Sequence, residues 1–441
     1  MENLFCMSRR TKTKRPNPFV YYFFGFIVSF LSFAKRRVLF TYRTPDGREV
    51  HGSKVREELV KVKPPYIIVG NHHSLYDYVF AIRAFYPRRI TFIVARKLYL
   101  ASKFHFFVKM ARAIPKNLFQ PDIQTIRQSF DILGNEGILA LYPEGQIVIN
   151  GISKDMPESC AKLIKKMKLP VFAIRTSGAY FCDATWRKYL KHGIIDINIS
   201  VALTPERIKE MTVEEIDEAI GKAIYVDNFA EQEKKGYLYK GSNRAKGLEN
   251  ILYRCPSCGI EFEIATHKNS IICKYCGCTA EYTESAHLMW NKSENYYPHI
   301  GEWYNAQRLA ERKAIEADSD YEIFIPVELR ILSETNTVIP SGGVELAVKK
   351  TRGIEKCGKG VLHIRKCGYT YSGDFFGEQK EIEFDVMKVR YVPYTPGDNF
   401  QIYVQDVMFA FYTIDRRYCA KAALVMESIY ASQSEKQQPA I

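Results

Sequence analysis

Two side chains capable of acid–base chemistry, His72 and Asp77, stand five positions apart in the segment GNHHSLYD, residues 70–77. The segment follows a short apolar run, so both side chains can meet in one tight turn that opens a helix. A carboxylate that accepts a hydrogen bond from one imidazole nitrogen fixes the tautomer and leaves the other nitrogen as a general base. A hydroxyl of the substrate would then take the place of the serine in a Ser-His-Asp triad. His73 is an alternative base, and a capping aspartate beside a solvated histidine is the alternative structural interpretation.

The surrounding sequence predicts the elements that position this pair. Four apolar runs have the length and composition of buried strands, namely YIIVG at 66–70, ITFIVA at 90–95, GILALY at 137–142 and LPVFAIR at 169–175. Helical periodicity appears at 78–86, 98–112, 122–134 and 204–223, and a hairpin is expected over 38–52. Strands that alternate with helices in this way predict an α/β domain with a covered sheet.

Two sequence motifs lie at the ends of two of the predicted strands. The pattern NHxxxxD after residues 66–70, and YPEG at 142–145, together resemble the glycerolipid acyltransferase family, which includes the lysophosphatidic acid acyltransferases. Lys97 with AIPK at 113–116 resembles a second block of that family, and LPVFAI at 169–174 resembles its fourth. The resemblance covers residues 35–225 and implies an α/β acyltransferase domain with a covered mixed sheet over 38–230.

The resemblance also implies roles for individual residues. In that family the histidine is the base, the aspartate orients it, and the Pro-Glu-Gly loop helps to hold the glycerol phosphate. These roles carry over to His72, Asp77, Glu144 and Gly145.

Two departures from the family pattern affect the expected phosphate site. The family usually has a threonine and then an arginine after the glycine of the Pro-Glu-Gly loop, whereas residues 146–148 are QIV and hold no cation. The second block usually ends in an arginine, whereas this chain has Lys116, whose ammonium lacks the bidentate fork of a guanidinium. We expect Lys116 and Arg175 to bind the substrate, with Arg112 as a further candidate. The alternative is that all three are solvated surface cations.

The reaction implied by the resemblance is acyl transfer from a thioester, either acyl-CoA or acyl-carrier protein, to a lysophospholipid or glycerol-phosphate-type hydroxyl. The expected acceptor is 1-acylglycerol-3-phosphate, although the missing cations leave other acceptors open. A neutral imidazole must take the proton of the hydroxyl, and the carbonyl oxygen needs hydrogen-bond donors, for which backbone amides near Gly145 are candidates. The alternative function is a catalytically idle lipid-binding scaffold.

A second group of residues has metal-ligand spacing. Cys255 and Cys258 in CPSCG, and Cys273 and Cys276 in CKYCG, form two knuckles in which one turn can present both sulfurs to one ion. Four thiolates suit a structural Zn²⁺, and the pattern resembles zinc ribbons, with Cys278 as a spare ligand. Five of the eleven cysteines fall in this cluster, which argues for an intracellular metal site and against a disulfide framework. The ribbon is expected to staple the domain or to bind an unknown protein partner.

Charge and an apolar N-terminal segment point to membranes. The chain has 63 Lys and Arg against 49 Asp and Glu, a formal net charge of +14, and such an excess suggests an anionic partner. Residues 18–34 hold no charge and lie between basic clusters, so residues 1–37 are expected to form a membrane anchor. A monotopic helix, a transmembrane span, a cleaved signal peptide and a buried core helix all remain open. We expect association with membrane lipids at the cytoplasmic face, and no binding to nucleic acid.

The remaining segments complete the predicted domain order. A charged linker is expected at 231–249, the zinc ribbon at 250–285, and a linker with helical character at 286–319. Residues 320–431 alternate as short strands and end in an amphipathic helix, an order that resembles the small β-barrel of pleckstrin-homology-like domains. The tail at 432–441 is expected to be disordered.

Overall fold

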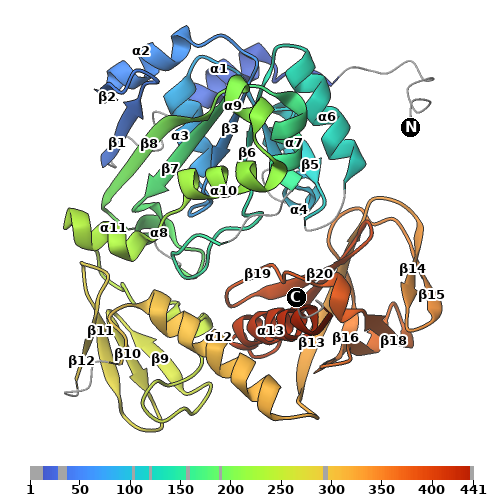
Figure 1. Cartoon of the computed structure of the whole chain (residues 1–441). Coiled ribbons are helices and arrows are strands. Elements are labelled where there is room, and N and C mark those ends of the chain that lie inside the picture. The colour runs from blue at the N-terminus through green and yellow to red at the C-terminus, as the bar shows by residue number, and fades with distance from the viewer. Residues whose placement is uncertain are drawn as a thin grey trace.

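The computed structural model describes residues 13–27, 37–101, 105–118, 122–154, 159–187, 191–291 and 296–437. Figure 1 shows an α/β domain in the upper half of the molecule and two smaller β-rich parts side by side below it. The yellow sheet contains the cysteine cluster, and the orange and red part is the C-terminal module.

The α/β domain is built on one mixed sheet of eight strands in the order β2-β1-β8-β7-β3-β6-β4-β5. The strands are β1 (Arg37–Arg43), β2 (Glu49–His51), β3 (Tyr66–Gly70), β4 (Ile90–Ala95), β5 (Ile114–Lys116), β6 (Ile138–Leu141), β7 (Val171–Ser177) and β8 (Ile194–Leu203). Strand β3 runs parallel to both of its neighbours, β6 and β7, whereas the pairs β1–β2 and β7–β8 are antiparallel. The mixed sheet and the hairpin predicted over 38–52 are therefore confirmed.

Helices cover both faces of this sheet. They are α2 (Ser53–Lys61), α3 (Asp77–Phe85), α4 (Arg96–Ala101), α5 (His105–Met110), α6 (Ile123–Gly134), α7 (Ser159–Met167), α8 (Ala179–Asp183), α9 (Pro205–Glu210), α10 (Val213–Ile224) and α11 (Asn228–Lys235). Alternate residues of β3 face opposite sides because strand side chains have a period of two. Tyr66 and Ile68 join the core that contains α2 and α3, and Ile67 and Val69 join the core that contains α6, α7 and α10.

The predicted linker at 231–249 is wrong, because this segment is packed against its neighbours. Helix α11 covers its first residues, and the 3-10 turn η2 (Leu248–Asn250) lies near its end. Ala245 and Leu248 are fully buried, and the Arg244 Nε–H donates to the Tyr282 carbonyl at 2.8 Å. A charged sequence is therefore held by a few buried apolar side chains and by a long-range hydrogen bond that local composition does not reveal.

The cysteine-containing part is a four-stranded antiparallel sheet in the order β12-β11-β10-β9. Its strands are β9 (Ile264–His267), β10 (Ser270–Cys273), β11 (Thr279–Tyr282) and β12 (Leu288–Trp290), so the sheet extends beyond the predicted boundary at 285. Helix α12 (Ile300–Ala317) follows and packs on it, with the Trp303 Nε1–H donating to the Arg254 carbonyl at 2.9 Å.

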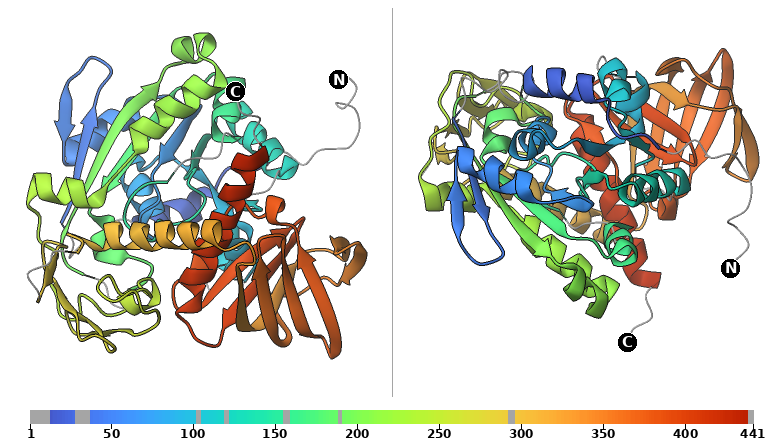
Figure 2. Two further views of the ribbon diagram at one scale, coloured as in Figure 1. Left: turned by 60° about the horizontal axis from the view of Figure 1, so that its bottom comes forward. Right: turned by 90° about the horizontal axis from the view of Figure 1, so that it is seen from above.

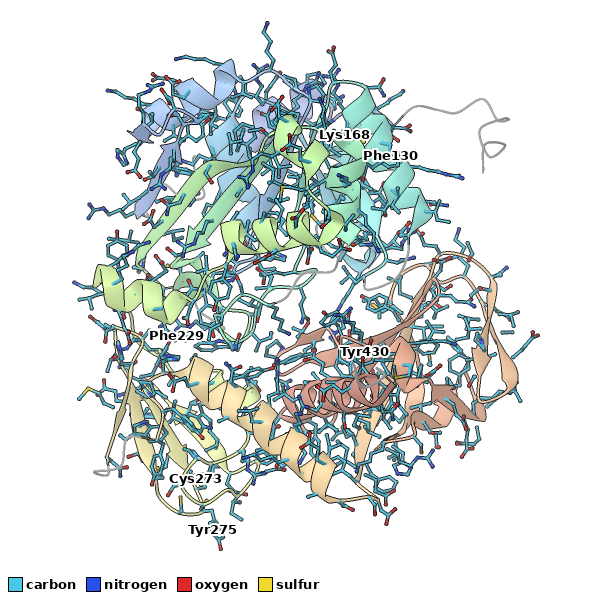
Figure 3. All side chains as sticks on the ribbon, in the orientation of Figure 1. Phe130, Lys168, Phe229, Cys273, Tyr275 and Tyr430 are labelled. Atoms are coloured by element: carbon cyan, nitrogen blue, oxygen red, sulfur yellow. The ribbon has the colours of Figure 1, made fainter. Side chains whose placement is uncertain are left out.

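Helix α12 also contacts the α/β domain. The ring of Phe229, labelled in Figure 3 on α11 near the start of α12, stacks on His299 with centroids 4.0 Å apart. Asn150 Nδ2 donates to Asn305 Oδ1 at 3.0 Å. A helix that was expected to be part of a linker therefore joins three parts of the molecule.

The C-terminal module is one antiparallel sheet of seven strands in the order β18-β17-β16-β13-β21-β20-β19. These strands are β13 (Glu322–Ser333), β16 (Glu355–Arg365), β17 (Gly368–Phe375), β18 (Glu378–Phe384), β19 (Tyr394–Thr395), β20 (Asn399–Val404) and β21 (Val407–Thr413). Three further elements belong to the module: the hairpin β14 (Thr337–Ser341) with β15 (Val344–Val348), and the 3-10 turn η3 (Val386–Lys388). Within the described residues the edge strands β18 and β19 do not pair, so hydrogen bonds do not close a barrel. The pleckstrin-homology-like resemblance stays a prediction.

Helix α13 (Tyr418–Gln437) ends the described chain and packs against α12, as Figure 2 shows. The disordered tail predicted from residue 432 is therefore wrong as far as Gln437. Glu435 forms an ion pair with Arg312 of α12 at 2.6 Å, and Gln433 hydrogen-bonds to the Lys366 carbonyl. The polar composition of this segment is typical of a disordered terminus, but contacts with residues far away in the sequence order it as far as Gln437.

The N-terminal apolar segment contains helix α1 (Pro18–Phe26), and the rest of its predicted span, residues 28–34, lies outside the described residues. Tyr21 and Gly25 are buried, with Gly25 close to Ile82 of α3, whereas Phe19 and Phe23 are exposed. Within the part of the chain that the structure describes, every helix is too short or too polar to cross a bilayer.

Candidate functional site

His72 and Asp77 meet where β3 ends and α3 begins. The chain leaves the sheet after Gly70, turns, and starts α3 at Asp77, so the two side chains face each other across the turn. The Asp77 Oδ2 atom lies 2.9 Å from His72 Nδ1 and also accepts the backbone N–H groups of His73 at 2.8 Å and Ser74 at 2.9 Å. This acceptor environment keeps a proton on Nδ1 and leaves Nε2 of His72 with a lone pair for an incoming hydroxyl.

His72 and Asp77 differ in their exposure to solvent. Asp77 is buried, and this burial raises the pKa of its carboxyl, while the hydrogen bonds from His72 and the backbone act in the opposite direction. The His72 side chain is 26% exposed, so it can meet a substrate. The geometry is that of a general base held by a carboxylate behind it.

His73 lies in a different environment from His72. Its side chain is fully buried, with Nε2 3.0 Å from Ser153 Oγ and Nδ1 accepting from Asn228 Nδ2 at 2.6 Å. Burial lowers the pKa of His73 to about 3. A neutral imidazole with both nitrogens occupied supports the loop, and only the backbone of His73 contacts Asp77.

Glu144 lies behind the loop that carries His72. Its Oε1 atom accepts the His72 backbone N–H at 3.1 Å and the Ser153 hydroxyl at 3.3 Å. Burial raises the pKa of Glu144 to about 8, so the acid is mostly protonated at neutral pH. These contacts make Glu144 a positioning residue for His72, and a direct contact to a substrate phosphate stays a prediction.

Gly145 adopts the left-handed conformation, with φ +73°, that lets the chain turn after Glu144. Its amide donates to the Tyr142 carbonyl at 3.1 Å, and the Val148 amide donates to the His72 carbonyl at 2.9 Å. Both amides therefore donate to carbonyls of the protein. A hydrogen-bond donor near Gly145 for the carbonyl oxygen of the substrate stays a prediction.

Tyr142, the first residue of the YPEG motif, contacts His72 in a way that the sequence did not reveal. Its ring stacks on the His72 imidazole with centroids 5.1 Å apart and planes 28° apart. A Cβ atom at position 70 would lie 2.7 Å from Cε1 of Tyr142, so glycine at the end of β3 makes room for this ring. Gly70, directly before the NHxxxxD pattern, was the sequence feature that could have indicated this contact. The role of that glycine becomes clear only from the packing of the Tyr142 ring.

The two predicted substrate-binding cations lie on different strands of the sheet, Lys116 on β5 and Arg175 on β7. Lys116 ends β5 at the edge of the sheet, with β4 and β6 between it and β3, and burial lowers the pKa of its ammonium. Arg175 donates from Nε to the Tyr225 carbonyl and from Nη2 to Glu231 Oε1, both at 2.8 Å. Binding of a substrate by Arg175 stays a prediction and requires release from this ion pair.

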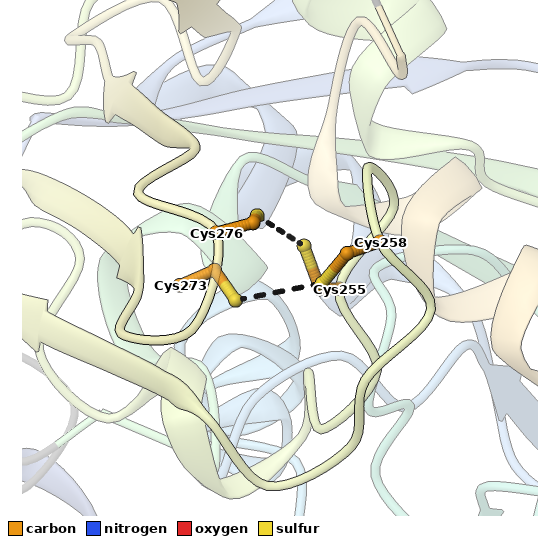
Figure 4. Close-up of side chains that lie close together, drawn as sticks. All are labelled: Cys255, Cys258, Cys273 and Cys276. Carbon is orange, nitrogen blue, oxygen red and sulfur yellow. Dashed lines mark hydrogen bonds between the residues drawn. The ribbon is translucent and has the colours of Figure 1, made fainter.

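The four cysteines Cys255, Cys258, Cys273 and Cys276 converge in one place, as Figure 4 shows, with all sulfurs within 4.8 Å of one another. The Cys255–Cys276 and Cys258–Cys273 sulfur pairs are 3.7 and 3.9 Å apart. A tetrahedral ion with metal–sulfur bonds of ~2.3 Å requires sulfurs about 3.8 Å apart, so the donor set fits such an ion. Gly259 and Gly277, which follow the knuckles, have φ of +74° and +71°, a conformation that favours glycine.

Two comparisons with known proteins found a match to part of the chain. Residues 48–177 match the family model described as Acyltransferase. The crystal structure of the 1-acyl-sn-glycerophosphate acyltransferase PlsC from Thermotoga maritima is similar at 16% identity and a TM-score of 0.36, covering 49% of this chain and 94% of that chain. No curated protein matches at a significant level.

Proposed function

We propose that this protein transfers a fatty acyl group from a thioester to the hydroxyl of a lysophospholipid or glycerol-phosphate-type acceptor. The observation that carries the proposal is the His72–Asp77 pair, joined at 2.9 Å inside the region that matches the acyltransferase family. The finer expectation is that the acceptor is 1-acylglycerol-3-phosphate and the donor is acyl-CoA or acyl-carrier protein.

The proposed step follows from the pair. Nε2 of His72 takes the proton of the acceptor hydroxyl while its oxygen attacks the thioester carbonyl. Asp77 stabilises the imidazolium that forms, because its Oδ2 already accepts the Nδ1–H of His72. The carbon–sulfur bond then breaks, the thiolate leaves with the proton from His72, and an oxygen ester remains.

Exposed aromatic side chains support the proposal that the enzyme works at a membrane, at the cytoplasmic face. Phe19 and Phe23 of α1 are 75% and 53% exposed, and the neighbouring Phe24 ring lies 5.5 Å from Phe107 of α5. Leu75, inside the loop between His72 and Asp77, is also 61% exposed. Aromatic side chains next to basic segments suit the headgroup region of an anionic bilayer.

We also propose that the four cysteines hold a structural Zn²⁺. Zinc prefers four thiolates in this geometry, and a closed set of four ligands leaves no position for a substrate. The partner of this ribbon outside the chain stays open, whereas inside the chain it packs on α12.

One assay separates the enzyme from the idle lipid-binding scaffold. Purified full-length protein is mixed with acyl-CoA or acyl-carrier protein and a panel of lysophospholipids, and free thiol is measured together with the lipid product. Acceptor-dependent thiol release that is lost in His72→Ala is the expected result. Acceptor binding without thiol release for any donor would favour the scaffold.

A further inference from the structure

A partly buried charged cluster lies next to the loop that carries Ser153, where the α/β domain meets α12 and α13. Lys154, from the loop after β6, places Nζ 3.9 Å from Glu427 Oε1 of α13. Arg308, from α12, places Nη2 3.5 Å from Glu427 Oε2. Two cations from different parts of the chain therefore share one carboxylate.

Neither contact is a hydrogen bond by distance and angle. Within the described residues, the buried Nε and Nη2 atoms of Arg308 make no hydrogen bond that meets the geometric criteria. Glu427 uses Oε1 to accept the Val392 amide at 3.4 Å. The guanidinium therefore has donors to offer, and an oxyanion is the group that matches its fork.

The cluster carries an excess of positive charge. The other titratable groups that act on it are Glu144, Tyr304 and Tyr394. The two tyrosine hydroxyls bond to each other at 2.8 Å, and burial raises both of their pKa values, so both stay neutral. Among the described residues, Lys154 and Arg308 share the one carboxylate of Glu427. A charge that is partly removed from water and incompletely paired is costly, so the arrangement favours an anion that completes it.

The cluster is connected to the catalytic pair by a short series of contacts. Lys154 follows Ser153 directly, Ser153 donates to Glu144 at 3.3 Å, and Glu144 accepts the His72 amide. These contacts connect the two cations to the backbone of the loop that carries His72.

We propose that Lys154 and Arg308 form the subsite for the anionic phosphate group of the acyl acceptor. This inference rests on the proposed acyl transfer. The acceptor is favoured over the donor because a glycerol phosphate carries its phosphate close to the reacting hydroxyl. In coenzyme A and in acyl-carrier protein, the long pantetheine arm separates phosphate from the thioester.

The subsite also accounts for a departure in the sequence. Residues 146–148 supply no cation after Gly145, and Arg175 is already paired with Glu231. Arg308 lies outside the region 48–177 that matches the acyltransferase family, so the C-terminal part of the chain contributes directly to the acceptor site.

The test compares two substitutions with a matched control in the full-length protein. Arg308→Gln and Lys154→Gln remove one cation each, and Arg312→Gln removes an arginine one turn further along α12 that pairs with Glu316 and Glu435 at the surface. For each variant, kcat/KM is measured with 1-acylglycerol-3-phosphate and with uncharged monoacylglycerol, together with the KM of the donor. Circular dichroism and the melting temperature establish that each variant is folded.

We expect the preference for the phosphate-bearing acceptor to fall about 10- to 100-fold in Arg308→Gln and Lys154→Gln, the usual effect of losing a charged hydrogen bond. Arg312→Gln should keep the preference of the wild type. Glu427→Gln, which removes the competing carboxylate, should lower the KM for the phosphate-bearing acceptor. An unchanged preference, or a rise in donor KM alone, would overturn the assignment.

A binding measurement separates this inference from the proposed reaction. If the wild type transfers no acyl group, equilibrium binding of 1-acylglycerol-3-phosphate to the full-length protein still tests the subsite. Weaker binding to Arg308→Gln than to Arg312→Gln supports it, and equal binding overturns it. Inorganic phosphate that binds as tightly as the lipid would mark a site for free phosphate and would also overturn the proposal.

Discussion

Glu144 Oε1 accepts the backbone N–H of His72 at 3.1 Å, so an acid from the loop after β6 fixes the turn after β3. The two strands are parallel neighbours, and their C-terminal ends therefore meet at one edge of the sheet. The Glu of the YPEG motif thus acts on the base through the backbone, whereas the resemblance suggested a contact to the substrate. This relationship makes the protonation of Glu144 a testable property.

Glu144 should make folding stability depend on pH. Its pKa is raised from 4.5 to about 8, chiefly by burial, so the stability it contributes is complete below pH 4.5 and is lost as the pH rises through about 8. The free energy of unfolding should fall by up to ~1.4 kcal/mol per pH unit across this window. Glu144→Gln should remove that part of the slope, which urea unfolding of both proteins between pH 5 and 9 would measure. Parallel slopes would mean that the carboxyl is already ionised.

The two adjacent histidines should respond differently to substitution. His72→Ala should reduce turnover at least ~10²-fold with little change in stability, because its exposed imidazole is the proposed base. His73→Ala should instead lower the free energy of unfolding by ~1–3 kcal/mol, because it removes one hydrogen-bond partner from Ser153 and one from buried Asn228. Asp77→Asn should impair turnover by loosening His72. Turnover and urea unfolding together distinguish the roles, and a loss of turnover confined to folded His73→Ala would reverse the assignment.

The sequence predicts only those contacts of the site that join residues close together in the chain or residues of a known motif. His72 and Asp77 lie within one turn, and apolar periodicity was enough to predict the sheet that positions them. The Glu144–His72 contact, the Tyr142 ring and the Lys154–Glu427 pair join segments far apart in the chain. Composition carries no information about such contacts, which is also why a packed segment at 231–249 looked like a linker.

The exposed aromatic face of α1 should contribute to membrane binding. Phe19→Ser combined with Phe23→Ser removes two exposed rings while leaving Tyr21 packed in the core. Co-sedimentation with vesicles of anionic lipid should weaken about 10-fold or more, because burial of each aromatic ring in the interface is favourable. Phe324→Ser, on the C-terminal sheet, replaces a ring that is about as exposed as Phe23 and serves as the control. Equal binding of all three proteins would place the membrane contact outside α1.

Removal of the metal should be visible in tryptophan fluorescence. All three tryptophans lie against the cysteine-containing sheet: Trp186 packs on Tyr282, Trp290 belongs to β12, and Trp303 donates to the Arg254 carbonyl. The purified protein should hold about one Zn²⁺ per chain, and a chelator or Cys255→Ser with Cys258→Ser should release it and shift the emission to longer wavelength.

The core on the α6, α7 and α10 face of the sheet lies within the α/β domain, whereas the core on the other face continues into the cysteine-containing sheet and the C-terminal module. Because the catalytic pair lies in the α/β domain, the chemistry should persist in part after zinc is lost. The remaining effect should arise through α12, which packs on the cysteine-containing sheet and presents Arg308 to the proposed acceptor subsite. Zinc loss should therefore raise the KM for 1-acylglycerol-3-phosphate more than it lowers turnover at saturating acceptor. The double substitution is cleaner than a change at Cys276, because Cys278 is buried two residues away and can supply a replacement thiolate. A wild-type protein without metal would refute the zinc site, and complete loss of turnover with the α/β domain still folded would refute its purely structural role.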